Sequence, residues 1–209
     1  MPPPGFSEFL ESVVRACEGC TRIVEMPRIS KFCELCEKAD DEQRKPAEEK
    51  AAREDLQARW KRQGIPTRFF PFNLKMDYEW ALKKATMIFG EVGTGKSCLG
   101  AQIMKRTGGK YISAAAMLDE IQDDNNKMWD FKEFTSLCLD DFTKINPTGY
   151  RVEKLFEIFN ERYANDRHTV ITCDTIADDV KKAWGKPGEA IVSRIGEWMQ
   201  KIHLKEKFR

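Results

Sequence analysis

The sequence predicts an α/β fold in which a parallel sheet is covered by helices on both faces. From about residue 65 onward, short β-rich runs alternate strictly with helix-forming stretches, and the runs are mainly apolar. Apolar strands of this kind are typical of parallel sheets buried on both sides, and the helices are typical of the crossovers that such sheets require. The expected strands are TMIFG (86–90), KYISA (110–114), SLCLD (136–140), TVITC (169–173) and QKIHL (200–204). The expected helices cover 97–106, 115–122, 149–164 and 176–199, the last broken near Gly185 and Gly188.

Composition indicates one globular domain with a small appendage. The chain has 209 residues, of which 41% are hydrophobic and 33% charged, and its net charge is +1. The protein as a whole therefore has no strong electrostatic attraction to nucleic acid or membrane, and any such contact needs a local patch. The first residues lack the pattern of a signal peptide, and no apolar run has membrane-spanning length, so we expect a cytoplasmic protein.

Three regions differ in composition. Residues 1–38 contain two Cys-x-x-Cys pairs, and residues 39–64 form a charged, Ala-rich linker. A helix is expected after Pro46, and Gly64 followed by Pro66 should end it. Its sparse apolar residues favour a solvated spacer, with a partner-binding helix as the alternative. Residues 65–209 form the α/β domain.

The segment GEVGTGKS at 90–97, called the phosphate loop below, fits the pattern G-x-x-x-x-G-K-[ST] in full. An expected strand precedes it and an expected helix follows it, which a chance Gly-rich turn would not require. The glycines allow successive N–H groups to point at phosphate oxygens, Lys96 would reach the β- and γ-phosphates, and the Ser97 hydroxyl would bind Mg²⁺. The expected nucleotide-binding residues are Gly90, Glu91, Val92, Gly93, Thr94, Gly95, Lys96, Ser97 and Cys98.

Two acids follow the expected strand at 136–140. Asp140 is expected to hold the Mg²⁺ through water, and Asp141 to polarise the attacking water as general base. An Asp pair after a strand is also common as a turn or helix start. Because phosphate transfer to a metabolite needs no water-activating acid, the pair favours an ATP-hydrolysing enzyme over a small-molecule kinase, which should also carry an arginine-rich lid.

The chain resembles the AAA+ ATPases of the DnaC-type helicase-loader family, which includes the IstB transposition ATPases. The resemblance covers about residues 64–205 and rests on GEVGTGKS, LCLDDF (137–142), VITCD (170–174), AIVSRIGEW (190–198) and GIPTRFFPF (64–72). It implies a P-loop AAA+ core without a C-terminal lid. It also implies a homo-oligomer that loads a hexameric replicative helicase onto single-stranded DNA in replication initiation. A transposition helper and a slow or non-hydrolysing nucleotide-dependent adaptor are the alternatives.

The resemblance also implies roles for three residues near the end of the domain. Arg194 in SRIGEW matches an arginine that such proteins insert into the ATP site of a neighbouring subunit, where it stabilises charge on the γ-phosphate. The alternative is an ordinary surface arginine. The family usually has Thr-x-Asn after its fourth strand, whereas this chain has Thr172 and Asp174. A carboxylate repels phosphate, so either Asp174 points away and Thr172 is the sensor, or hydrolysis is slow.

Cys17, Cys20, Cys33 and Cys36 are the expected ligands of a structural Zn²⁺ ion. Their pairs, CEGC and CELC, are separated by twelve residues, and four thiolates in two such pairs complete a tetrahedral site. A redox pair and uncoordinated thiols are the alternatives. The resemblance supports the zinc module, since loader relatives begin with a small zinc domain. Cys98, Cys138 and Cys173 are expected in the core.

Basic residues that could contact nucleic acid are scattered. Arg22, Arg28 and Lys31 lie between the cysteine pairs and could meet nucleic acid or an acidic protein face, although a solvated face is equally compatible. Lys105, Arg106 and Lys110 are candidates for single-stranded DNA contact in the α/β domain, but interleaved aromatic residues are missing there.

Overall fold

The computed structural model of the protein describes residues 12–16, 18, 22–27, 34–73, 78–174 and 178–206. The chain divides into two compact units, Met1–Leu56 and Gln57–Arg209. Within the described ranges, no helix is both long enough and apolar enough to cross a membrane.

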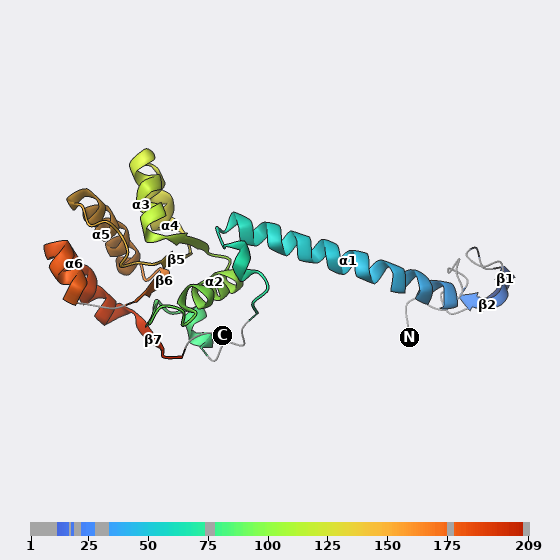
Figure 1. The fold of residues 1–209 in the computed structure, drawn as a ribbon. Helices are drawn as coiled ribbons and strands as arrows, with labels where there is room; N and C mark the ends of the chain where they lie inside the picture. Colours follow the sequence, from blue (N-terminus) through green and yellow to red (C-terminus); the bar gives the residue numbers. More distant parts are fainter. Residues whose placement is uncertain are drawn as a thin grey trace, which may run out of the picture. The chain divides into compact units, whose positions relative to one another are not determined.

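The first unit contains a hairpin and most of a long helix (Figure 1). Strands β1 (Ser12–Ala16) and β2 (Ile23–Pro27) pair antiparallel, with Ser12 opposite Pro27. The first cysteine pair thus falls between the two strands in the sequence. Helix α1 (Glu34–Arg62) starts before Pro46 and contains it, because the residues on both sides are strong helix formers. It ends at Arg62, and Gly64, with φ 81°, follows its end as expected.

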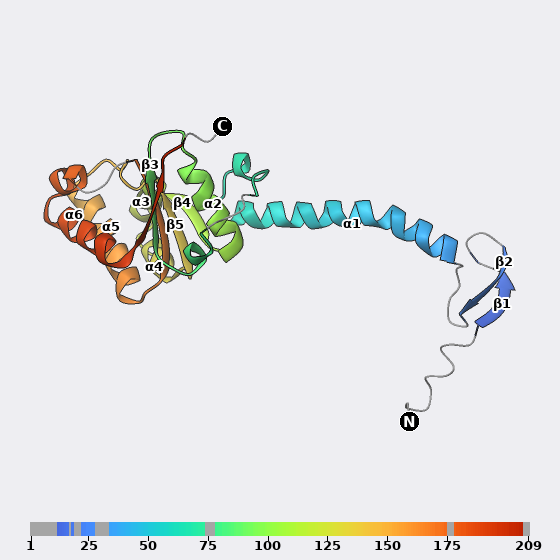
Figure 2. The same cartoon turned by 90° about the horizontal axis from the view of Figure 1, so that it is seen from below.

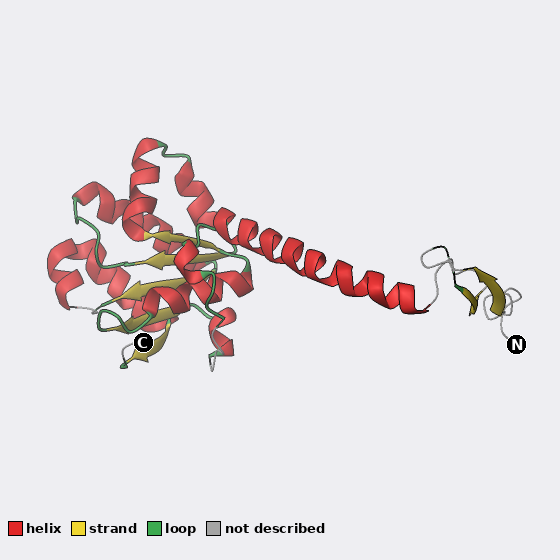
Figure 3. Cartoon of the chain, turned by 45° about the vertical axis from the view of Figure 1, so that its right-hand side comes forward, coloured by secondary structure: helices red, strands yellow, loops and turns green. Residues whose placement is uncertain are grey.

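The second unit is built on a five-stranded parallel sheet of order β4-β5-β6-β3-β7, whose strands lie side by side in Figure 3. The strands are β3 (Thr86–Gly90), β4 (Lys110–Ser113), β5 (Ser136–Asp140), β6 (His168–Cys173) and β7 (Gln200–Leu204). All five predicted strands are therefore confirmed to within one residue, together with the parallel sheet.

Helices cover both faces of this sheet, as predicted (Figure 2). Helix α2 (Lys96–Thr107) covers one face, while α3 (Ala114–Asp123), α4 (Lys127–Glu133), α5 (Gly149–Ala164) and α6 (Asp178–Trp198) belong to the other. The backbone of α6 breaks at Gly185, with φ 60° and ψ −149°. Helix α4 and the short 3₁₀ helices η1 (Thr67–Phe69) and η2 (Glu79–Leu82) were not predicted, because each is too short to show a clear period.

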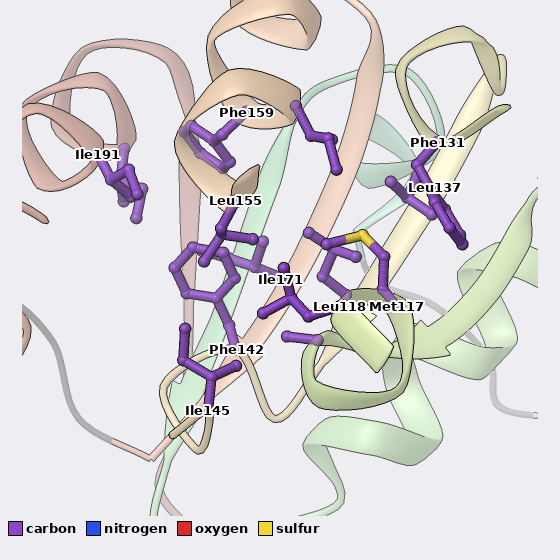
Figure 4. Packing of buried hydrophobic residues seen from close by; sticks show 14 of the residues in the cluster. Met117, Leu118, Phe131, Leu137, Phe142, Ile145, Leu155, Phe159, Ile171 and Ile191 are labelled. Carbon is purple, nitrogen blue, oxygen red and sulfur yellow. The ribbon is translucent and has the colours of Figure 1, made fainter. Parts of the chain in front are cut away.

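Each face of the sheet has its own apolar core. The larger core joins α3–α6 to the sheet through residues such as Leu118, Phe142, Leu155 and Ile171, which are at most 1% exposed (Figure 4). The smaller one packs α2 and η1 against the opposite face. Cys98, Cys138 and Cys173 are buried in these cores, as predicted. Burial raises the pKa of the Cys138 thiol well above its ordinary value, which keeps it protonated.

The strand order determines which side chains can meet. Strand β6 lies between β3, which leads into the phosphate loop, and β5, which ends in Asp140. Because all the strands are parallel, the segments after β3, β5 and β6 emerge at the same edge of the sheet. The residues that follow β6 therefore lie between the phosphate loop and the acid pair.

Candidate nucleotide-binding site

The phosphate loop has the backbone that its glycines permit. Gly90, Gly93 and Gly95 all have positive φ, at 149°, 87° and 89°. A Cβ at Gly90 would lie 2.2 Å from the Leu204 carbonyl oxygen, so no other residue fits there. Helix α2 begins directly at Lys96, and the loop therefore presents the positive end of a twelve-residue helix.

Lys96 is the first residue of α2, at the end of the loop, and is 7% exposed. Its Nζ donates to the carbonyl oxygens of Gly90 and Glu91, each at 2.8 Å. It also forms an ion pair with Asp174, at 2.8 Å from Oδ1. The ammonium group is thus held where the loop turns, at the position from which it could contact a phosphate.

Asp174 points toward the phosphate loop rather than away from it. Besides Lys96, its carboxylate contacts Lys144 at 3.2 Å, and Lys144 also pairs with Asp141 at 2.9 Å. The hydrogen bond from Lys96 is the main reason that the pKa of Asp174 lies below its ordinary value. Two cations thus offset the carboxylate, as an acid beside a phosphate site requires.

Thr172 supports the acid pair and does not face the loop. It is fully buried, and its hydroxyl donates to Asp140 Oδ1 at 2.5 Å while accepting from the Asp141 N–H at 3.0 Å. Asp141 has φ 53°, so the backbone turns sharply at this residue. Both hydrogen-bonding capacities of the hydroxyl are thus used to position Asp140 and Asp141, and the sensor role of Thr172 stays a prediction.

Tyr111 in β4 is a further residue of the site that sequence reasoning did not identify. It is 4% exposed, and its hydroxyl lies beside Ser97 and Asp140. Burial above all raises the pKa of Tyr111, so its hydroxyl remains a donor. A buried tyrosine hydroxyl usually needs a partner, which was the available signal.

These groups fit a Mg²⁺ ion. The Ser97 hydroxyl and the Asp140 carboxylate are oxygen ligands of the kind that Mg²⁺ prefers, and Mg²⁺ in proteins keeps several of its waters. The Tyr111 hydroxyl lies beside both of them and adds a hydrogen-bond donor at that position.

A cavity of about 430 Å³ opens beside the loop and is large enough for a nucleotide. Val92, Gly93, Gly95, Lys96, Ser97, Cys98, Asp141, Lys144 and Asp174 line one part of it. The other part is lined by Arg68, Phe69 and Phe72, from the segment before β3. Six of the nine predicted loop residues and Asp141 are therefore brought together with Asp174, whereas Gly90, Glu91 and Thr94 do not line the cavity.

Arg194 does not line this cavity. Its guanidinium lies over the rings of Phe156 and Tyr163 in α5, with Cζ 5.1 and 5.6 Å from their centroids. Nη1 donates to the Ala190 carbonyl at 3.2 Å, while Nε is buried without a partner among the described residues. The arginine is therefore packed on its own subunit, half-buried between α5 and α6.

Lys105, one of the candidates for DNA contact, holds the segment before β3. Its Nζ donates to the carbonyls of Phe69, Phe70 and Phe72 at 2.7, 3.1 and 2.9 Å and lies 4.2 Å from the Trp60 ring centroid. All three N–H groups of the ammonium are thus used to hold the segment before β3. Burial lowers the pKa of Lys105.

Three of the four predicted zinc ligands, Cys17, Cys20 and Cys33, lie outside the described residues. The basic residues Arg28 and Lys31 lie outside them as well. Cys36 is described; it lies in the first turn of α1 and is partly buried. The described ranges contain no cluster of His, Cys, Asp or Glu that could hold a metal by itself. The zinc site therefore stays a prediction.

Neither protein-family models nor curated proteins match this chain. Solved structures do. The DnaC helicase loader superposes with a TM-score of 0.55 at 17% identity, over 67% of this chain and 100% of that one. DnaI superposes with a TM-score of 0.51 at 20% identity, over 61% of this chain and 77% of that one. DnaA from Aquifex aeolicus, bound to AMPPCP, superposes with a TM-score of 0.52 at 19% identity, over 65% of this chain and 49% of that one. The α/β P-loop fold is thus confirmed: the chain shares the fold of the DnaC helicase loader, DnaI and DnaA.

Proposed function

We propose that this protein is a Mg²⁺-dependent ATPase that acts as a helicase loader in the initiation of DNA replication. The observation that carries the proposal is the cavity in which the phosphate loop, including Ser97, meets Asp141 and Asp174. A loop of this kind beside an acid pair suits hydrolysis of a nucleoside triphosphate. The similarity in fold to the DnaC helicase loader supports the loader role.

Each residue then has a defined part. The N–H groups of the loop and Lys96 bind the β- and γ-phosphates, and the aromatic residues Phe69 and Phe72 are candidates to contact the base. Mg²⁺, held by Ser97 and Asp140, would neutralise charge on the phosphates. Thr172 keeps Asp140 in position, and Asp141 accepts a proton from the attacking water.

The site is proposed to be completed by a second copy of the chain. Arg194 would leave its place between Phe156 and Tyr163 and reach the γ-phosphate in the neighbouring subunit. In its present place Arg194 contacts one carbonyl and two ring faces. Loss of these contacts costs less free energy than breaking a buried ion pair would. Partners of the homo-oligomer would be a hexameric replicative helicase and single-stranded DNA in the cytoplasm. A DnaA structure with bound single-stranded DNA shares the fold.

ATPase turnover, measured with and without single-stranded DNA and purified helicase, tests the proposal. Turnover should require Mg²⁺ and be lost in Lys96→Ala and Asp141→Asn, while Asp123→Asn, an exposed acid outside the cavity, should retain it. Co-purification of a hexameric helicase with the full chain would support the loader role. Transfer of phosphate to a metabolite, or turnover that is unchanged in Asp141→Asn, would contradict it.

A non-hydrolysing adaptor is the second candidate, and the ion pair between Lys96 and Asp174 favours it. A carboxylate on the phosphate-binding lysine weakens its attraction for the γ-phosphate and slows turnover. Tight ATP binding without measurable hydrolysis, in the presence of both DNA and helicase, would identify the adaptor.

A further inference from the structure

A second cavity of about 430 Å³ lies at the opposite edge of the sheet from the phosphate loop. It is formed where α1 and α2 end and where β4 and β5 begin, and all its residues belong to the second unit. It is lined by Arg59, Arg62, Gln63, Thr107, Gly108, Gly109, Lys110, Phe134, Thr135 and Ser136. Because the phosphate loop lies at the carboxyl ends of the strands and this cavity at their amino ends, the two are separate sites.

Three cations line the second cavity without an acid among the lining residues. Arg59 and Arg62 come from the last two turns of α1, and Lys110 begins β4. In the part of the chain that the structure describes, none of the three forms an ion pair. Cations in a cavity without partners attract an anionic ligand.

Gln63 gives an independent indication of a ligand. It is 8% exposed, and neither its amide nitrogen nor its amide oxygen has a partner among the described residues. The residue is fixed by its backbone, because its carbonyl accepts from the Tyr111 N–H at 2.7 Å. An unsatisfied buried amide is costly, and it lies in the lining of the cavity, so a ligand with both a donor and an acceptor would satisfy it.

Two further hydroxyl groups of the cavity are already in use. Thr107 and Ser136 share a hydrogen bond of 3.0 Å, and Ser136 also contacts His168 Nδ1 at 2.6 Å. The ring of Phe134 is half-buried, and its backbone carbonyl is held by Arg162 at 2.7 Å. A ligand could therefore meet three cations, the carboxamide of Gln63, the hydroxyl of Thr135 and the part of the Phe134 ring that does not pack on Phe131.

We propose that this cavity binds a nucleoside phosphate, with the phosphate between Arg59, Arg62 and Lys110 and the base on Phe134 and Gln63. A base offers the adjacent donor and acceptor that a carboxamide reads, and its flat face suits an aromatic ring. The same chemistry is presented by a free nucleotide and by a nucleotide within a single strand. The site does not depend on hydrolysis at the phosphate loop.

The test uses the full-length chain with Lys96→Ala, so that the phosphate loop does not contribute. Binding is measured by fluorescence anisotropy with a labelled six-nucleotide oligodeoxyadenylate, and by competition with AMP. Arg62→Ala and Lys110→Ala should each weaken oligonucleotide binding by about tenfold, as expected for a lost charged contact. Each should also reduce the slope of log K against log salt by about 0.7. Lys127→Ala, an exposed cation outside both cavities, is the matched control and should change neither.

Gln63→Leu separates binding from folding. Removal of an unsatisfied buried amide should leave the melting temperature unchanged or raise it, while the affinity for the oligonucleotide falls by about fivefold or more. Its salt slope should stay the same, because no charge is removed. If Gln63 had only a structural role, Gln63→Leu would lower the melting temperature and leave the affinity for the oligonucleotide unaltered.

The outcomes are distinct. Competition by AMP identifies a free nucleotide as sufficient, whereas oligonucleotide binding that AMP does not displace identifies a strand; both support the site. Absence of binding by either probe overturns it, as does binding that the cavity variants do not alter. Equal displacement by a glutamate peptide of the same charge, with no effect of Gln63→Leu, overturns the assignment to a nucleotide. ATPase activity of the chain with Lys96 intact is measured separately, so failure at one site is not mistaken for failure at the other.

Discussion

Lys96 Nζ lies 2.8 Å from Asp174 Oδ1, so the lysine of the phosphate loop is paired with the acid that follows β6. A second cation, Lys144, contacts the same carboxylate at 3.2 Å. The lowered pKa of Asp174 keeps it ionised throughout the neutral range, and the pair is therefore present under ordinary conditions. A γ-phosphate that approached Lys96 would meet this carboxylate, so nucleotide binding must compete with the pair.

Asp174→Asn should therefore strengthen ATP binding by about fivefold, because it removes a negative charge beside the phosphates and releases Lys96. Titration with a fluorescent ATP analogue measures the change. Asp123→Asn is the matched control, since Asp123 is exposed and lies outside the cavity. Weaker binding in Asp174→Asn would mean that the carboxylate holds Lys96 and Lys144 in the binding geometry instead of competing with the ligand.

Arg194 should act across a subunit interface if it is an arginine finger. Arg194→Ala and Lys96→Ala subunits are each expected to be inactive alone. In an equal mixture, about one quarter of the interfaces combine an intact loop with an intact arginine, so ATPase activity should partly return. Arg151→Ala, whose arginine pairs with Asp119 on its own chain, should be active without mixing. No recovery at any mixing ratio would count against a role in trans.

Arg162 should be essential for stability, because it is fully buried and joins α4 to β6. Its guanidinium donates to the carbonyls of Phe131, Lys132, Phe134 and His168 and to the Thr169 hydroxyl, at 2.7–3.2 Å. Arg162→Met leaves these acceptors unsatisfied and should cost about 3–5 kcal/mol in the free energy of unfolding.

Urea denaturation measures this effect. Arg167→Met is the control, since Arg167 forms a surface pair with Glu133 and its loss should cost about 1 kcal/mol or less. Equal effects of the two substitutions would show that the hydrogen bonds of Arg162 add little to stability.

His168 should make stability depend on pH. Its Nε2 contacts the Ala81 carbonyl at 2.8 Å and must carry the proton, so Nδ1 accepts from the Ser136 hydroxyl at 2.6 Å and the ring is neutral. Burial lowers the pKa of His168, so below its ordinary value of 6.5 the unfolded chain binds more protons than the folded one. Stability should therefore be constant above about pH 7 and decrease as the pH falls through 6.5.

The urea midpoint, followed between pH 5 and pH 8, checks this expectation. In His168→Gln the side chain cannot be protonated in this range. The variant should be less stable than the wild type at pH 8, but its urea midpoint should change less between pH 5 and pH 8. If the wild-type and variant curves run parallel, groups other than His168 cause the pH dependence.

The cysteine pairs should bind zinc. Metal analysis of the purified chain is expected to give about one Zn²⁺ per molecule, lost in Cys33→Ser. Cys98→Ser, a buried cysteine outside the module, should retain the metal and serves as the control. Removal of zinc by a chelator should unfold the first unit while ATP binding to the second persists. A folded, metal-free first unit would exclude the zinc site.

The sequence alone determined the α/β architecture and the phosphate loop. Both depend on local patterns: apolar runs define β3–β7, three glycines define a loop backbone that few other residues permit, and Gly64 ends α1. Such signals are read within about ten residues and need no knowledge of distant partners. The short helix α4 lacked such a pattern, since it is held by Arg162, a residue 31 positions away from Phe131.

Only the tertiary structure decided how the functional side chains pair. The order of the strands places β6 between the loop and the acids, which puts Thr172 on Asp140 and Asp174 on Lys96. It also brings Tyr111 beside Ser97, and the end of α1 beside the start of β4, where Gln63 and three cations line the second cavity. These relationships join residues far apart in the chain, and their geometry follows from how the strands and helices pack, which no local sequence pattern contains.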